Sequence, residues 1–75
     1  MTRLPLVSGR ELIRALSRAG FEEVRTRGSH VSLRKITPER TYKTVVPLHK
    51  ELARGTVNEI LKQAGLTREE LINLL

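Results

Sequence analysis

The sequence predicts an α+β fold in which a three-stranded antiparallel sheet is covered by helices on one face. Three observations support this fold class. Helix-start signals occur near both ends of the chain, the middle alternates polar and apolar residues with the period of a strand, and short turn sequences separate the alternating segments. The predicted order is therefore α-β-β-β-α, followed by a short extra helix at the C-terminus.

The first helix is predicted to follow Ser8 and to end at Gly20. Ser8 and Glu11, three residues apart, form a capping box, in which each side chain accepts a hydrogen bond from the backbone N–H of the other residue. Apolar residues from Leu12 onward then repeat at helical spacing. Gly20 suits the left-handed end of a helix, and Phe21 is expected to enter the core directly after it.

Two further helices are predicted after the strands. Thr56 and Glu59 have the form of a second capping box, and Gly65 ends the apolar repeat that follows them. Thr67 and Glu70 form a third box, which begins a short terminal helix. The apolar side of this short helix needs a neighbour to pack against.

Turn sequences divide the middle of the chain into three strands. Residues 26–30 predict a turn between the first two strands. Residues 37–40 predict a second turn, with a proline at its favoured second position. Residues 41–46 are rich in β-forming side chains and are followed by Pro47, which ends the third strand. Adjacent strands on short turns are expected to form an antiparallel meander.

The second strand has two chemically different faces. Period-two alternation places Val31 and Leu33 on one face and His30, Ser32 and Arg34 on the other. The apolar pair must turn toward the helices. We therefore expect His30 to point to the face of the sheet that the helices leave uncovered.

Positive charge is concentrated in the same part of the chain. The protein has 14 Lys and Arg against 8 Asp and Glu, a formal net charge of +6. Residues 25–50 contain seven basic residues and one acidic residue, so this segment carries the whole excess. A basic middle between neutral ends is typical of a site for a polyanion. Equally, it is typical of a solvated face that keeps a protein in solution.

His30 is the candidate catalytic residue because histidine gains and loses a proton near neutral pH. RNA cleavage needs a base to take the proton of the ribose 2′-OH and an acid to protonate the leaving 5′-oxygen. Basic side chains nearby would stabilise the charge that develops on the phosphate. The alternative is that His30 is a surface residue flanking a hairpin. His49 fits a structural position better than a catalytic one.

The residues predicted to contact RNA surround His30 in the sequence. Gly28 lacks a side chain, so a phosphate has room to approach the backbone there. Arg27 and Arg34 are the basic residues nearest to His30 along the chain. The predicted RNA contacts are Arg27, Gly28, Ser29, Arg34, Lys35 and Lys43.

The chain has no cysteine, which excludes disulfides and thiolate zinc sites. Two distant histidines without clustered carboxylates make a poor metal site. We therefore expect neither a metal nor a cofactor. The composition suits a reducing compartment, no apolar run is long enough for a membrane span, and a cytoplasmic location is expected.

The whole chain resembles the HicA-like toxins, also called the YcfA-like family, of prokaryotic toxin–antitoxin pairs. The resemblance is carried by several short pieces that occur in the family's order. These are Leu4-Pro5, Ser8-Gly9-Arg10-Glu11-Leu12, Gly20-Phe21, Gly28-Ser29-His30, Val46-Pro47-Leu48-His49, Gly55-Thr56, and the segment from Ile60 to Leu71. Gly28-Ser29-His30 is the family's signature.

The resemblance implies a single toxin domain over residues 1–75 with a double-stranded-RNA-binding-domain-like fold. It implies the toxin of a type II toxin–antitoxin system, a metal-independent mRNA endonuclease (mRNA interferase) that arrests growth, with His30 as the catalytic histidine. It also implies a HicB-like antitoxin as partner, which covers the active site. Residues 34–40 form a slightly long connection in comparison with the family.

Two other functions fit parts of the sequence. A non-catalytic RNA-binding module would have the same basic middle and the same fold, because double-stranded RNA is recognised through shape, phosphates and 2′-OH groups. DNA binding is the third possibility, since residues 56–64 and 67–75 resemble a helix-turn-helix. The second of these helices has few polar side chains able to contact bases, which makes DNA binding the least favoured of the three.

Overall fold

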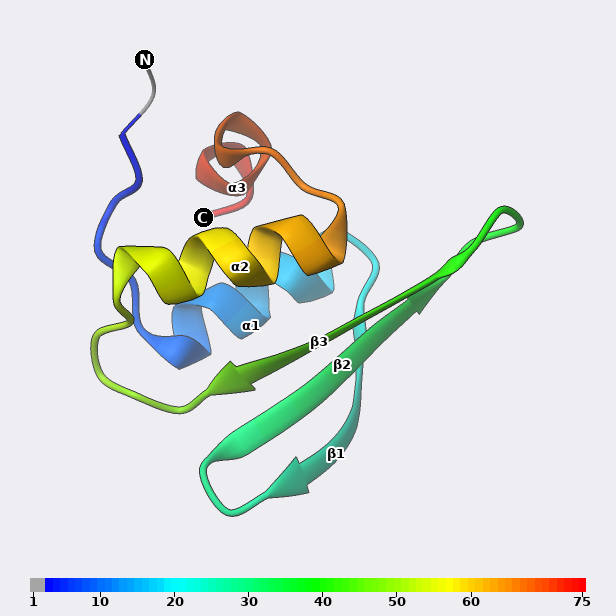
Figure 1. Cartoon of the computed structure of the whole chain (residues 1–75), viewed down its shortest axis with the longest axis horizontal. Coiled ribbons are helices and arrows are strands. Elements are labelled where there is room, and N and C mark those ends of the chain that lie inside the picture. Colours follow the sequence, from blue (N-terminus) through cyan, green and yellow to red (C-terminus); the bar gives the residue numbers. More distant parts are fainter. Residues whose placement is uncertain (1–2) are drawn as a thin grey trace.

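The computed structural model describes residues 3–75 and has the predicted α+β architecture (Figure 1). The order of elements is α-β-β-β-α-α, so the fold class and the extra C-terminal helix are confirmed. The elements are α1 (Gly9–Arg18), β1 (Glu22–Arg27), β2 (His30–Ile36), β3 (Thr41–Pro47), α2 (Arg54–Ala64) and α3 (Arg68–Leu74). Within the described residues, no helix has the length and apolar character needed to cross a bilayer.

The three strands form an antiparallel meander in the order β1-β2-β3. A two-residue turn, Gly28-Ser29, joins β1 to β2, so that Arg27 pairs directly with His30. Across the other edge of β2, His30 pairs with Pro47, the last residue of β3. The β1–β2 register shifts between Glu23 and Arg25, which marks a β-bulge in the edge strand.

The helices lie on one side of this sheet (Figure 1). Alternate residues of β2 and β3 turn toward them, and Val31, Leu33 and Val46 are buried there. Thr44 is a buried polar residue in the same layer, and its hydroxyl donates a hydrogen bond to the Gln63 side chain of α2 at 2.7 Å. We call the side away from the helices the open face. Its residues include Glu22, Arg25, Arg27, His30, Ser32, Arg34, Lys43 and Val45.

Helix α1 begins and ends as its sequence predicts. The Ser8 hydroxyl accepts from the Glu11 backbone N–H at 3.1 Å, and the Glu11 carboxylate accepts from the Ser8 N–H at 2.8 Å. The Ser8 backbone N–H that donates to this carboxylate is the main cause that holds the pKa of the Glu11 carboxyl below its ordinary value. At the other end, Gly20 has a φ of 98°, and Phe21 donates its N–H to the Leu16 carbonyl. This arrangement satisfies the final carbonyls and buries the Phe21 ring.

The predicted start of α2 is wrong. The helix begins at Arg54, and its N-cap is Ala53, which has no side-chain capping bond. Thr56 therefore lies inside the first turn. The reason is tertiary: the Leu52 N–H donates to the Val7 carbonyl at 2.8 Å, and the Leu52 side chain is buried, so the chain is already positioned for a helix before Thr56.

The end of α2 and the start of α3 are confirmed. Gly65 ends α2 in the left-handed region, with a φ of 70°. The capping box of Thr67 and Glu70 is present at the start of α3. Leu71 of α3 is fully buried, and the Arg18 guanidinium donates to the Leu74 carbonyl at 2.5 Å. Helix α3 therefore finds the neighbour that its apolar side needs.

The difference between the two N-termini gives a stability prediction. Ser8→Ala should lower the free energy of unfolding by about 1 kcal/mol, because it leaves an N-terminal N–H of α1 without its acceptor. Thr56→Ala should change it by less than about 0.5 kcal/mol, since no capping bond is lost. Urea unfolding followed by circular dichroism measures both. Equal losses in the two variants would show that Thr56 caps α2 in solution.

Candidate nucleic-acid interface

His30 is the first residue of β2 and lies on the open face, where its side chain is exposed. The turn before it requires a glycine. Gly28 has a φ of 56°, whereas Ser29 does not have a positive φ, and this is the pattern of a type II′ hairpin turn. Apart from its two neighbours in the chain, no residue has an atom within 4 Å of the position that a Cβ on Gly28 would take. The turn is therefore open to solvent, and a ligand has room to approach its backbone.

The structure brings most of the predicted site residues together on the open face. Arg27 is the cross-strand partner of His30. Farther along β2, Arg34 shares the face of His30 and pairs with Lys43 of β3. Cross-strand partners on one face have neighbouring side chains. A histidine and three basic residues thus share one side of the sheet, as the alternation predicts.

Lys35 is the exception among the predicted RNA contacts. It shares the face of Val31 and Leu33, and its Cε lies 3.3 Å from the position that a Cβ on Gly20 would take. Its side chain also lines a hollow with Leu74 of α3. Lys35 is therefore separated from His30 by the sheet. Period-two alternation already contained this signal, because Lys35 is two residues beyond Leu33.

Backbone hydrogen bonds fix the turn that precedes His30. The Leu48 N–H donates to the Ser29 carbonyl at 2.7 Å, which extends the β2–β3 pairing past Pro47. One residue after Leu48, the His49 carbonyl accepts a hydrogen bond from the Gly9 N–H at the start of α1, at 2.9 Å. The role that the structure shows for His49 is thus structural and uses its carbonyl, while its side chain is exposed.

One acidic side chain moderates the charge of the open face. The Glu22 carboxylate accepts from Arg34 Nε at 2.9 Å. Both side chains are well exposed, at 42% for Arg34 and 62% for Glu22, so the pair contributes at most about 1 kcal/mol to stability. Its main effect is electrostatic, because it offsets the charge of Arg34 toward an incoming anion.

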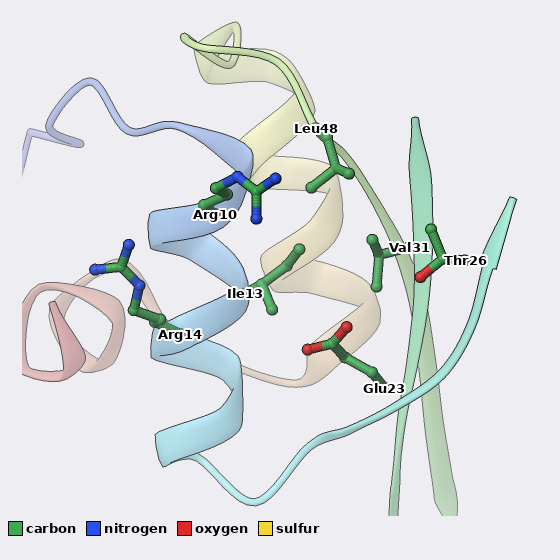
Figure 2. Close-up of a pocket in the computed structure, with 7 residues that line it drawn as sticks. All are labelled: Arg10, Ile13, Arg14, Glu23, Thr26, Val31 and Leu48. Carbon is green, nitrogen blue, oxygen red and sulfur yellow. The ribbon is translucent and has the colours of Figure 1, made fainter. Parts of the chain in front are cut away.

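A larger cavity, the α1–β1 groove, lies on the helix side of the sheet (Figure 2). Its volume is about 390 Å³. The groove is lined by Arg10, Ile13, Arg14, Glu23, Thr26, Val31 and Leu48. A concave site of this size is a usual first choice for a ligand site. This groove contains no histidine, and the Glu23 carboxylate offsets part of the charge of Arg10 and Arg14, so we place the interface on the open face.

Across residues 3–75, no three side chains of the His, Cys, Asp and Glu types gather in a way that could hold a metal ion. The candidate chemistry of the open face comprises the His30 imidazole, three guanidinium groups, the Lys43 ammonium group, the Glu22 carboxylate and the Ser32 hydroxyl.

Comparison with known proteins gives one family. The sequence model of that family matches residues 9–66, and its description is HicA toxin of bacterial toxin–antitoxin. The matched range includes the Gly28-Ser29-His30 turn and all three strands. No curated protein shows a significant match to the chain.

The Glu22–Arg34 pair gives a prediction about anion binding. Glu22→Gln should tighten binding of a single-stranded RNA oligonucleotide about two- to fivefold at low salt, because it removes a negative charge and releases Arg34. Glu59→Gln makes the same charge change on α2 and is the control. Titrations followed by fluorescence anisotropy compare the two. Equal tightening by both variants would mean that only net charge matters.

Proposed function

This chain belongs to the HicA toxin family of bacterial toxin–antitoxin systems, and on that premise we propose that it is an endoribonuclease that cleaves mRNA. One observation carries the proposal beyond the family: His30 is exposed on the basic open face, directly after an open glycine turn. An RNA strand on this face would bring its phosphates to a group that exchanges protons near neutral pH.

The proposed reaction is a transesterification within the RNA strand. Neutral His30 takes the proton of a ribose 2′-OH, and the 2′-oxygen attacks the adjacent phosphorus. The bond from phosphorus to the 5′-oxygen of the next nucleotide then breaks, and a proton is returned to that oxygen. The products are a 2′,3′-cyclic phosphate and a 5′-hydroxyl. No electron transfer, cofactor or metal enters this scheme.

Arg27 is the basic residue best placed to assist His30. It is the direct cross-strand partner of His30 on the same face. A guanidinium there would stabilise the added negative charge on the phosphorus during the attack. The remaining proposed RNA contacts are the backbone of Gly28 and Ser29, followed by Arg34 and Lys43. Lys35 also stays a predicted RNA contact, and this contact would require RNA to reach the helix side of the sheet.

As a toxin of a toxin–antitoxin pair, the chain has an antitoxin as its partner. We propose that residues 1–75 are one toxin domain of a type II system, that the protein acts in the cytoplasm, and that the antitoxin is a HicB-like protein that covers the open face. The charge of +6 favours a partner with an acidic surface, since complementary charge speeds association.

His30→Ala tests the proposed activity. The variant should fold normally and bind RNA with similar affinity, while cleavage falls at least about 100-fold, the usual contribution of a proton-transfer group. Cleavage of labelled RNA is measured with EDTA present, and growth arrest is measured after expression in cells. His49→Ala is the control and should keep its activity, because the His49 contact uses the carbonyl.

The outcomes separate the proposal from its alternatives. A His30→Ala protein that still cleaves RNA in EDTA would refute the role of His30. A wild-type chain that binds RNA but never cuts it would instead support a non-catalytic RNA-binding module.

The antitoxin proposal makes a genomic and a biochemical prediction. A reading frame for a HicB-like protein should adjoin the gene of this chain, and its product should co-purify with the chain and stop RNA cleavage. Arg27→Glu should slow association with that protein, with a salt dependence, because it reverses a charge on the covered face. Arg14→Glu on α1 is the control. Stronger slowing by Arg14→Glu would place the antitoxin on the helix side instead.

A further inference from the structure

A small hollow opens on the open face a short distance from His30. It is lined by Val24, Arg25, Ser32, Arg34 and Lys43, and its volume is about 190 Å³. Ser32 is two residues beyond His30 on the same face of β2, which corresponds to about 7 Å along the strand. The hollow therefore lies beside His30 in the direction of the β2–β3 turn.

The β-bulge in β1 builds one wall of this hollow. Glu23 pairs with Leu33, but the next pair is Arg25 with Ser32, so Val24 is an extra residue in β1. After the bulge, Arg25 and Arg27 both occupy the open face, opposite Ser32 and His30. In an unbroken register from the Gly28-Ser29 turn, Val24 would stand opposite Leu33 on the helix side, whereas the bulge brings it to the hollow. Bulges are frequent beside functional sites because they redirect side chains in this way.

The hollow is positively charged and has an apolar side. Arg34 is engaged by Glu22, but Arg25 and Lys43 have no ion-pair partner among the residues that the structure describes. The Ser32 hydroxyl adds a hydrogen-bond donor between them. Val24 at the rim is 49% exposed, and Val45, the cross-strand partner of Ser32, is 46% exposed. A group that is anionic at one end and apolar at the other would fit this arrangement.

We propose that this hollow is a second phosphate subsite, which holds the RNA phosphate adjacent to the one at His30. Arg25 and Lys43 bind the phosphate oxygens, Ser32 donates a hydrogen bond, and Val24 contacts the neighbouring ribose or base. The inference rests on the proposed function. Its consequence is that the subsite sets the register of the strand and so determines which linkage lies at His30.

RNA fits the hollow better than an acidic protein segment does. Two cationic positions follow each other along one strand face, Arg27 beside His30 and Arg25 beside Ser32. A nucleic acid presents one negative charge per nucleotide at regular intervals, which matches such a repeat. In the α1–β1 groove, by contrast, the Glu23 carboxylate shares the lining with Arg10 and Arg14 and offsets part of their charge.

The experiment uses the wild-type chain and a short RNA whose cleaved position has been mapped. A 2′-deoxy sugar at that position prevents cleavage, and single phosphates are replaced, one at a time, by neutral methylphosphonates. Dissociation constants are measured by anisotropy. For the wild type, neutralising the phosphate adjacent to the scissile one should weaken binding about tenfold, as expected for a charge-assisted contact.

Arg25→Ala links this loss to the hollow. The variant should bind the unmodified RNA about tenfold more weakly, and neutralising the adjacent phosphate should then cost almost nothing further. Neutralising any other phosphate should still weaken its binding. The slope of affinity against salt should fall by about 0.7, the value for one contact on a single strand. Arg14→Ala removes the same charge on the helix side and should not change the pattern of losses.

Three outcomes would contradict the proposals, and the measurements distinguish them. Arg25→Ala could weaken RNA binding by the same factor whichever phosphate has been neutralised. The hollow would then bind no specific phosphate, and the proposal would be overturned, while cleavage by His30 would stand. If Arg25→Ala leaves RNA binding intact but weakens antitoxin binding, the hollow is a protein contact and the proposal is again overturned. If the wild type never cleaves RNA, the proposed function fails, and a scan of every linkage still shows whether one phosphate couples to Arg25.

Discussion

The close approach of α1 to the end of β3 holds the rest of the structure in place. Gly9 begins α1, and a Cβ on this residue would overlap the carbonyl oxygen of Pro47. The Gly9 N–H donates to the His49 carbonyl. The N–H of Leu48, which lies between Pro47 and His49 in the chain, donates to the Ser29 carbonyl. Helix α1, the end of β3 and the turn before His30 are thus joined by backbone contacts. The position of His30 depends on this junction more than on its own side-chain contacts.

The helices that meet at this junction lie on one face of the sheet and leave the other uncovered. The helices cover β2 and β3, and all six residues of β1 are exposed. Strand β1 is therefore held chiefly by its pairing with β2, and its bulge and charged side chains discourage another strand from joining its free edge. An edge strand with so little burial contributes little to the core. Its contribution is to carry Arg25 and Arg27 to the open face.

Much of the fold was predictable because local signals and tertiary packing agree. The capping boxes at Ser8 and Thr67 and the glycine at 65 mark helix ends that the structure retains. The alternation around Val31 correctly separates the core face of β2 from the face of His30. The start of α2 was missed because the Leu52 contact with Val7, distant in sequence, overrides the local signal at Thr56.

The site was less predictable than the fold, for a physical reason. Glu22, rather than Glu23, stands beside Arg34 on the open face only because the bulge adds Val24, and no residue pattern in β1 marks a bulge before the pairing with β2 is known. The side of the sheet on which Lys35 lies is different, since its shared alternation with Val31 and Leu33 was visible in the sequence. Proximity along the chain was the weaker guide, because adjacent strand residues point to opposite faces.

The open face combines properties that a stable monomer has no use for. Several cationic side chains share it with exposed valines, and Glu22 is the acidic residue that the structure places among them. Like charges on one small surface repel each other and lower stability, so an anionic ligand that neutralises them gains favourable energy on binding. RNA and an acidic antitoxin would both relieve this repulsion. If both use the same cations, they exclude each other, and inhibition of the toxin needs no change in its shape. Control of the toxin would then follow from the same charge arrangement that is proposed to bind RNA.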